Sequence, residues 1–173
     1  DTLTYGEDLN KTYSSILNKL QELDYDGAYV YTYDDPIHIT ETGSWTVPKS
    51  IFLQAFFNPN NCQVLMGESR RIPSVELFDN EYTYYEDRFT SVIVPIFTND
   101  DHHGIFVCNT DVAHFSSIYA TSLQLGAALK YMALLREQNL TQEQLKMSLD
   151  EIHEKNELLN HLSTSDELTG IYN

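Results

Sequence analysis

The chain has 173 residues, of which 42% are apolar and 12% aromatic, and these proportions exclude a largely disordered protein. Its 26 acidic and 10 basic residues give a net charge of −16, which excludes a broad nucleic-acid-binding surface. No stretch approaches the 18 or so uncharged apolar residues of a transmembrane helix. We therefore expect a cytoplasmic domain that contacts neither nucleic acid nor membrane.

The first 40 residues predict a helix followed by two strands. Apolar residues recur at the spacing of one helical face from about Glu7 to Leu23, and an Asp-Gly turn follows. Residues 28–33 are tyrosine-rich and typical of a strand. Residues 34–36 (DDP) predict a turn, after which 37–40 is expected to return as a second strand.

The middle of the chain is less regular. Residues 51–57 (IFLQAFF) fit a short helix or a buried strand equally well, and 58–61 (NPNN) predicts a turn. Two more strands are expected, at 62–66 and at 71–78, and Pro73 breaks the second of them. The tyrosine-rich residues 80–88 predict a loop or a short helix.

The clearest strand pair is an apolar run, a polar loop and a second apolar run. Residues 91–97 and 104–108 are the strands of this predicted hairpin, in which Pro95 favours an edge position or a bulge. The loop between them carries His102 and His103 beside two aspartates. These are metal-ligand residue types, but neighbouring loop residues point apart and no further ligand is apparent. We expect a solvated turn and no metal site.

The two cysteines, Cys62 and Cys108, are too few for a disulfide-stapled scaffold. Neither has the CxxC partner of a structural zinc site. Cys108 ends the apolar run Ile105–Cys108, which predicts a small buried side chain rather than a reactive thiol.

After residue 111 the pattern is helical for about 50 residues. Its first part is apolar over much of its circumference, and small residues such as Gly126 would let another helix approach closely. From Gln138 onward the apolar stripe narrows to a short, imperfect heptad repeat. A single solvated helix docked on its own domain is the alternative to self-association. We expect a parallel homodimer whose seam contains Leu145, Leu149, Ile152, Asn156 and Leu159.

The end of the chain carries its most specific motif. Residues 166–173 (DELTGIYN) resemble the DxLTGLxN segment that opens GGDEF domains, the catalytic module of diguanylate cyclases. The matching residues are Asp166, Leu168, Thr169, Gly170 and Asn173, with Ile171 in place of the usual leucine. The resemblance implies that the sequence stops before the catalytic loop of that domain. It therefore assigns no catalytic residue here, and implies GTP and Mg²⁺ only for the GGDEF domain itself.

Residues 1–135 resemble a GAF-type sensory domain in the order of their elements: helix, strands, hairpin and long exit helix. The sharpest similarity is Val94–Phe97, a polar loop and Gly104–Val107, which resemble the strand pair near the end of GAF domains. Phe115, in the loop that follows, also fits. The residues of cyclic-nucleotide-binding GAF domains are not visible, and a PAS domain is the alternative.

A small-molecule ligand of unknown identity is the expected signal of such a domain. Sensor pockets are mostly apolar with a few polar groups, and the irregular aromatic segments before the hairpin supply both. The alternative is that these aromatic side chains only fill a small core. The candidate pocket residues are Trp45, Tyr82, Tyr84, Tyr85 and Arg88.

Together these features predict an α+β fold: a GAF-like antiparallel sheet with flanking helices and a long C-terminal signalling helix. The expected parts are a sensory domain at 1–135, a coiled-coil linker at 136–163 and the start of a GGDEF domain at 164–173. The expected function is to regulate cyclic di-GMP synthesis, with no catalysis by residues 1–173. The alternatives are a ligand-free dimerisation module and a PAS-like sensor of another signalling protein.

Overall fold

The computed structural model describes the backbone of most of the chain. Side chains are not described for 2–9 and 163–169, the ends of the two long helices. The chain divides into two compact units, Asp1–Met132 and Ala133–Asn173. The described segments are 2–39, 46–65, 70–85, 89–110 and 114–169.

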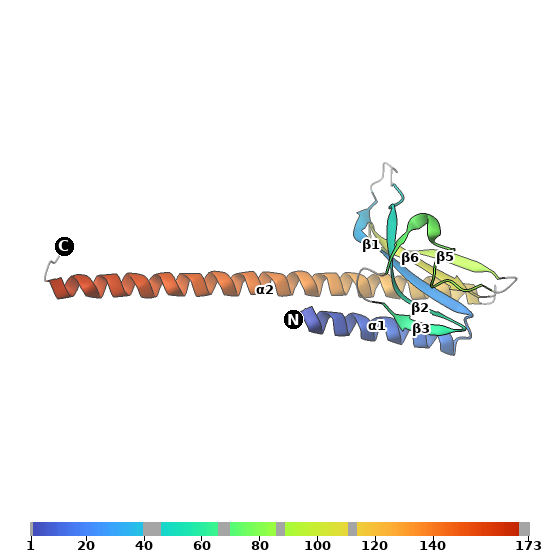
Figure 1. Ribbon diagram of the computed structural model, residues 1–173, viewed down its shortest axis with the longest axis horizontal. Helices are drawn as coiled ribbons and strands as arrows, with labels where there is room; N and C mark the ends of the chain where they lie inside the picture. Colours follow the sequence, from blue (N-terminus) through green and yellow to red (C-terminus); the bar gives the residue numbers. More distant parts are fainter. Residues whose placement is uncertain (1, 40–45, 66–69, 86–88, 111–113, 170–173) are drawn as a thin grey trace. The chain divides into compact units, whose positions relative to one another are not determined.

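Within the described residues, the first unit is an α+β fold with an antiparallel six-stranded sheet, as the sequence predicts (Figure 1). The strand order is β3-β2-β1-β6-β5, and β4 pairs with β2. The central strand β1 therefore lies between β2 and β6. The elements are α1 (Thr2–Glu22), β1 (Gly27–His38), β2 (Ser50–Asn58), β3 (Asn61–Val64), β4 (Arg71–Pro73), the 3-10 helix η2 (Ser74–Glu76), β5 (Ser91–Thr98), β6 (Asp101–Asn109) and α2 (Phe115–Thr169).

Helix α1 ends where the sequence predicts a turn. Its last residue is Glu22, and Asp24 then adopts a left-handed backbone conformation with φ of 57°. Short polar side chains tolerate this conformation at a helix C-terminus. The chain reverses there, so that β1 begins at Gly27 beside the end of β6.

Strand β1 is longer than predicted. It continues through residues 34–36, where the sequence predicts a turn, and Ile37 and His38 pair with His102 and Asp101 of β6. A register shift between Thr32 and Ile37 accommodates the extra residues as a bulge, where proline is tolerated. The predicted return strand at 37–40 is therefore wrong.

The ambiguous segment 51–57 lies in strand β2, and the predicted turn at 58–61 is confirmed. The side-chain Oδ1 of Asn58 accepts hydrogen bonds from the backbone N–H groups of Asn60 and Asn61, both at 2.9 Å. This Asx-type turn joins β2 to β3. The strand predicted at 71–78 is shorter, because β4 ends at Pro73 and η2 follows.

The predicted hairpin is confirmed as β5 and β6, and β5 is at the end of the strand order, as Pro95 indicates. Helix α2 reaches this hairpin closely at Gly126. A Cβ atom there would lie 2.1 Å from the backbone carbonyl oxygen of Phe97, so only glycine fits without displacement. The element that packs closely on Gly126 is therefore strand β5, and not another helix as the sequence predicts. Phe115, expected in a loop, is the first residue of α2.

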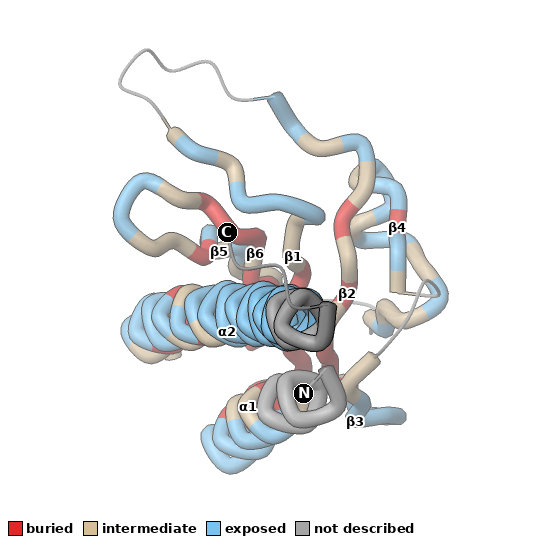
Figure 2. Tube along the Cα trace, turned by 90° about the vertical axis from the view of Figure 1, so that its left-hand side faces the viewer, coloured by how far each residue is buried: buried red, intermediate tan, exposed pale blue. Residues whose placement is uncertain are grey.

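Two hydrophobic layers cover the sheet, because successive residues of β1 point to opposite faces. On one face, α1 and the first turns of α2 lie side by side (Figure 2). This helix-side layer contains Leu17, Leu20, Val30, Phe106, Ile118 and Leu125. The tyrosine-side layer contains Tyr29, Tyr31, Leu53, Phe56, Ile72 and Val107, packed against Leu77 and Tyr82.

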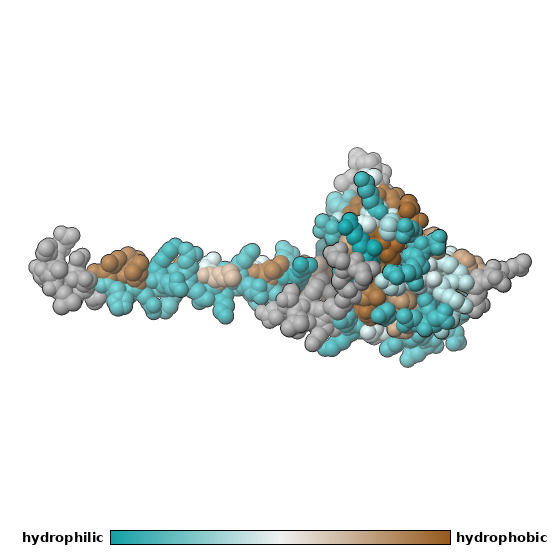
Figure 3. All heavy atoms as spheres, in the orientation of Figure 1, coloured by the Kyte–Doolittle hydropathy of each residue, from teal (hydrophilic) through white to brown (hydrophobic). Residues whose placement is uncertain are grey.

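The second unit consists, in its described part, of the C-terminal stretch of α2. Every described side chain from residue 136 to residue 162 is exposed. Figure 3 shows that hydrophobic side chains gather in patches along this otherwise hydrophilic stretch. The exposed apolar side chains include those at the expected seam positions, which are 55–62% exposed: Leu145, Leu149, Ile152 and Leu159.

Candidate functional site

The tyrosine-rich segment before β5 is fastened to the tyrosine-side layer of the sheet. The Tyr82 ring packs on Phe56 with ring centroids 5.4 Å apart. Asn58 Nδ2 donates a hydrogen bond to the Tyr82 carbonyl oxygen at 3.1 Å, and the Tyr84 backbone N–H donates to the Tyr29 hydroxyl at 3.2 Å. These contacts hold the segment over the end of the sheet where β1 begins, which we call the pocket end.

Asn80 shapes the turn that leads into this segment. Its side-chain Nδ2 donates to the carbonyl oxygen of Glu76 at 2.8 Å, and its Oδ1 accepts from the Tyr82 backbone N–H at 3.1 Å. The Asn80 backbone N–H donates to Thr83 Oγ1 at 3.1 Å. Asparagine is favoured in such turns because its short amide replaces backbone partners. In the described part of residues 80–88, the predicted loop therefore begins with a turn that hydrogen bonds between neighbouring residues hold together.

A pocket of about 140 Å³ opens at the pocket end. The Tyr85 and Phe89 rings stack at its wall, 4.0 Å between centroids and 19° between planes. Asn109 is buried, and its side-chain Oδ1 accepts a hydrogen bond from Ser91 Oγ at 2.6 Å. The described residues around this smaller pocket are Asp26, Pro59, Tyr84, Tyr85, Phe89, Thr90 and Asn109.

A larger, more open pocket of about 410 Å³ lies along the β2–β3 turn. It shares Tyr84 with the smaller pocket. Amide side chains dominate its lining, with Glu81 as the one charged group among the described lining residues. These residues are Phe56, Asn58, Asn60, Asn61, Gln63, Glu81, Tyr82, Thr83 and Tyr84.

The hydroxyls of Tyr29, Tyr31 and Tyr85 remain neutral at physiological pH. Burial raises the pKa of Tyr29 and that of Tyr31. Burial, followed by the neighbouring Tyr29, raises the pKa of Tyr85 to about 12. The phenols can therefore donate or accept hydrogen bonds but carry no charge. Among the described residues that line the smaller pocket, the carboxylate of Asp26 is the one charged group.

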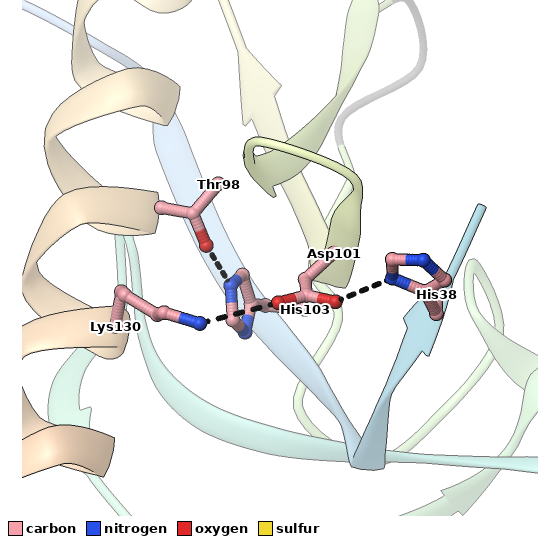
Figure 4. A network of polar contacts seen from close by, with 5 residues as sticks. All are labelled: His38, Thr98, Asp101, His103 and Lys130. Atoms are coloured by element: carbon pink, nitrogen blue, oxygen red, sulfur yellow. Dashed lines mark hydrogen bonds and ion pairs between the residues drawn. The ribbon is translucent and has the colours of Figure 1, made fainter. Parts of the chain in front are cut away.

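A second polar cluster lies at the opposite end of the β1–β6 pair, which we call the histidine end (Figure 4). One carboxylate oxygen of Asp101 lies 3.1 Å from His38 Nδ1, and the other accepts from Lys130 Nζ at 3.3 Å. These two hydrogen bonds lower the pKa of Asp101. His103 Nε2 hydrogen-bonds to Thr98 Oγ1. The cluster connects β1, β5, β6 and α2.

The predicted solvated turn at His102 and His103 is wrong. The β5–β6 turn consists of Asn99 and Asp100, where Asn99 has a left-handed φ of 52°. Both histidines belong to β6 and are only 5% and 7% exposed. The end of β1 pairs with this part of β6, so residues that form a loop in a simple hairpin become buried strand.

Aromatic rings and burial determine the properties of these histidines. The His102 ring stacks on Phe97 at 4.6 Å and meets the edge of Tyr33 at 4.9 Å. Burial lowers the pKa of both His102 and His103, and Lys130 lowers that of His103 further while Asp101 opposes the change. Both rings are therefore neutral at pH 7. No group of three or more His, Cys, Asp or Glu side chains within the described part of the chain is arranged to hold a metal ion.

Both cysteines are free. Cys108 is buried as predicted, and burial raises the pKa of its thiol. Cys62 is exposed on β3. The high pKa of the Cys108 thiol makes it unreactive at neutral pH.

The structure brings three of the five predicted pocket residues to the pockets: Tyr82, Tyr84 and Tyr85. Trp45 and Arg88 lie outside the described residues. Sequence reasoning missed Asp26, Phe89 and Asn109. No local pattern indicates them, because they come from segments that only the strand order places together.

The GGDEF-like motif lies at the end of the described chain. The backbone of Asp166, Leu168 and Thr169 belongs to helix α2, and their side chains are outside the described residues. Gly170 and Asn173 are also outside them. The structure therefore adds no side-chain geometry to this motif.

A scan against protein-family models, a search of curated proteins and a search of solved structures each find no match. Among the helices that the structure describes, none is both long and apolar enough to cross a membrane. The fold is established at the level of an α+β architecture, with an antiparallel six-stranded sheet and a long C-terminal helix in the described residues.

Proposed function

We propose that this chain is the regulatory sensory input and dimerisation module of a diguanylate cyclase. The observation that carries the proposal is the segment 166–173, DELTGIYN, which resembles the opening of a GGDEF domain and begins in the last residues of the long helix α2. A GGDEF domain joined there would synthesise cyclic di-GMP from GTP with Mg²⁺. Residues 1–173 would control that synthesis and contribute no catalytic residue.

Features of the first unit support an input role. It combines a leading helix, an antiparallel sheet and a proline-containing hairpin, the features in which the sequence resembles a GAF domain. Its tyrosine-side layer ends in two pockets. Helix α2 takes part in the core of this unit through Ile118 and Leu125, so a change of packing there would act directly on the helix that leads to the motif.

The heptad positions support dimerisation in parallel. Leu145, Leu149, Ile152 and Leu159 are exposed in the single chain, and a partner helix would bury them. Asn156 would pair with its counterpart and fix the register at a cost in stability. Synthesis of cyclic di-GMP joins two GTP molecules, so a parallel pair would bring two output domains to the same place.

A ligand-free dimerisation module is the second candidate, because the exposed heptad positions favour self-association whether or not the pockets are used. A PAS-like sensor of another signalling protein remains the alternative for the first unit. A thermal shift of residues 1–173 with small molecules distinguishes a sensor from a pure dimerisation module.

The cyclase assay tests the proposal directly. The full-length protein, incubated with GTP and Mg²⁺, is expected to make cyclic di-GMP, whereas residues 1–173 alone are expected to make none. A full-length gene without a GGDEF domain after Asn173 would overturn the proposal. Product formation by residues 1–173 would contradict the assignment of catalysis to the output domain.

Dimerisation is tested by light scattering on residues 1–173. We expect the mass of a dimer for the natural chain and that of a monomer for Leu149→Glu, because a charge at the seam cannot be buried unpaired. Met147→Glu is the matched control, since Met147 is 74% exposed and lies outside the proposed seam. A natural chain that is monomeric at every concentration would refute the dimer.

Regulation through α2 is tested by insertions after Ser148 in the full-length protein. A seven-residue insertion preserves the heptad phase and is expected to leave the response to a signal largely intact. Insertions of three or four residues rotate the output domains and are expected to change the basal rate. Equal rates for every insertion length would show that the helix is a passive tether.

A further inference from the structure

We propose that the smaller pocket at the pocket end binds a small organic cation, an ammonium group carrying short alkyl substituents. This inference rests on the proposed sensory function and names the chemical class of the signal. It depends on three observations: aromatic rings at the wall, a carboxylate at the rim and the small volume. Each of them is independent of the GGDEF-like motif.

The wall of the pocket is aromatic. Tyr85 and Phe89 stack on each other, and Tyr84 lines the pocket beside them. The face of an aromatic ring carries partial negative charge, so it attracts a cation within about 6 Å of the ring centre. Phe89 is 51% exposed although it is large and apolar, which is expected of a ring that a ligand would cover.

Among the described lining residues of the pocket, one carries a negative charge. Asp26 is exposed, and within the described residues its carboxylate makes no ion pair. None of the other described lining residues is an Asp, Glu, Lys, Arg or His, and burial raises the pKa of the Tyr85 phenol to about 12. The described lining residues therefore favour a cation over an anion. The chain as a whole carries a charge of −16, which also favours the approach of cations.

The backbone holds Asp26 in a fixed position. Its N–H donates to the carbonyl oxygen of Asn109 at 3.0 Å, at the start of the β1–β6 ladder. The next residue is Gly27, where a Cβ would lie 3.2 Å from the Phe57 carbonyl oxygen, so the strands are tightly packed there. A carboxylate on such a rigid frame needs little reorganisation to receive a ligand.

The volume limits the ligand to a small one. About 140 Å³ is well below the roughly 300–1,000 Å³ of pockets for drug-sized molecules, so the pocket favours a ligand smaller than a nucleotide. A compact ammonium head group placed in this pocket would contact both the carboxylate and the aromatic wall. Thr90 and the buried Asn109 add polar atoms for a hydroxyl or N–H group on the ligand.

Calorimetric titration of residues 1–173 with choline tests this inference. Its neutral isostere, 3,3-dimethyl-1-butanol, has the same shape without the charge. We expect choline to bind and the isostere not to bind. Asp26→Asn is expected to weaken choline binding by about tenfold or more, and Phe89→Leu by several-fold.

Asp24→Asn is the matched control. Asp24 is also exposed and lies two residues away, but it does not line the pocket, and asparagine tolerates its left-handed φ of 57°. This variant loses the same charge and should bind choline as the natural chain does. Unchanged melting temperatures would show that the three variants remain folded.

The inference is overturned if choline does not bind the natural chain at millimolar concentration, if the isostere binds equally well, or if Asp26→Asn and Asp24→Asn bind alike. The cyclase assay separates this result from the proposed function. Cyclic di-GMP synthesis by the full-length protein without choline binding would refute only the cation site. Choline binding without a GGDEF domain would refute only the cyclase.

Discussion

The pocket end and the histidine end of the β1–β6 pair both carry an acidic side chain beside aromatic residues, but they use it differently. At the histidine end, Asp101 is paired with both His38 and Lys130, and the neighbouring histidines are buried. At the pocket end, Asp26 makes no ion pair within the described residues and faces a pocket. A carboxylate with two partners connects elements of the fold, whereas one without such partners is available to a ligand.

The two ends also differ in the elements that pack against the sheet. Helix α2 is seated on β5 near the histidine end, where Gly126 contacts the Phe97 carbonyl. At the pocket end, a turn and an irregular segment lie over the tyrosine-side face of the sheet. We therefore expect changes at the histidine end to lower stability, and changes at the pocket end to leave it nearly unchanged.

The largest expected effect is that of Gly126→Ala. Helix propensity alone would make this change stabilising by about 1 kcal/mol. The new Cβ would lie 2.1 Å from a backbone oxygen that cannot move alone, so we expect destabilisation by about 3 kcal/mol instead. Urea denaturation measures the difference. Ala127→Ser, at the exposed neighbouring position, should change stability by less than about 0.5 kcal/mol.

The second-largest expected effect is that acidification lowers the free energy of unfolding through the buried histidines of the histidine end. Burial lowers the pKa of His102 and His103 below the ordinary value of 6.5, so the unfolded chain binds more protons than the folded chain as the pH falls. This contribution to stability is complete above pH 6.5 and is lost progressively below it. Urea midpoints at pH 7.5 and pH 5.5 should therefore differ more for the natural chain than for the His102→Gln/His103→Gln double variant. Equal differences would contradict the burial of the two rings.

The smallest and most discriminating effect is the contrast between two isosteric changes. Asp101→Asn removes the charge that His38 and Lys130 contact, so we expect a lower melting temperature. Asp26→Asn removes a charge without an ion-pair partner in the described residues, so its stability should stay within about 0.5 kcal/mol of the natural chain. Calorimetric melting of both variants measures the contrast. Equal losses would show that the two ends do not differ in this respect.

Local features of the chain were predictable where the pattern itself carries the information. Helix α1, the Asn58 turn, the β5–β6 hairpin and the onset of α2 follow from periodicity and turn residues, which act over a few neighbours. Pro95 indicated an edge strand because proline cannot donate to a ladder. Tyr82, Tyr84 and Tyr85 line the two pockets, and ligand binding by them stays a prediction.

What the sequence by itself determined is therefore the position of the two helices, the Asn58 turn and the β5–β6 hairpin, and that the fold is α+β. The tertiary structure decided which strands meet. Pairing with β6 extended β1 through residues 34–38, and this pairing buried His102 and His103. Pairing with β1 made residues 51–57 a strand. The tertiary structure also placed Asp26, Phe89 and Asn109 around one pocket. The physical reason is that strand pairing joins residues far apart in sequence, while periodicity reports only that a face is apolar and not what covers it.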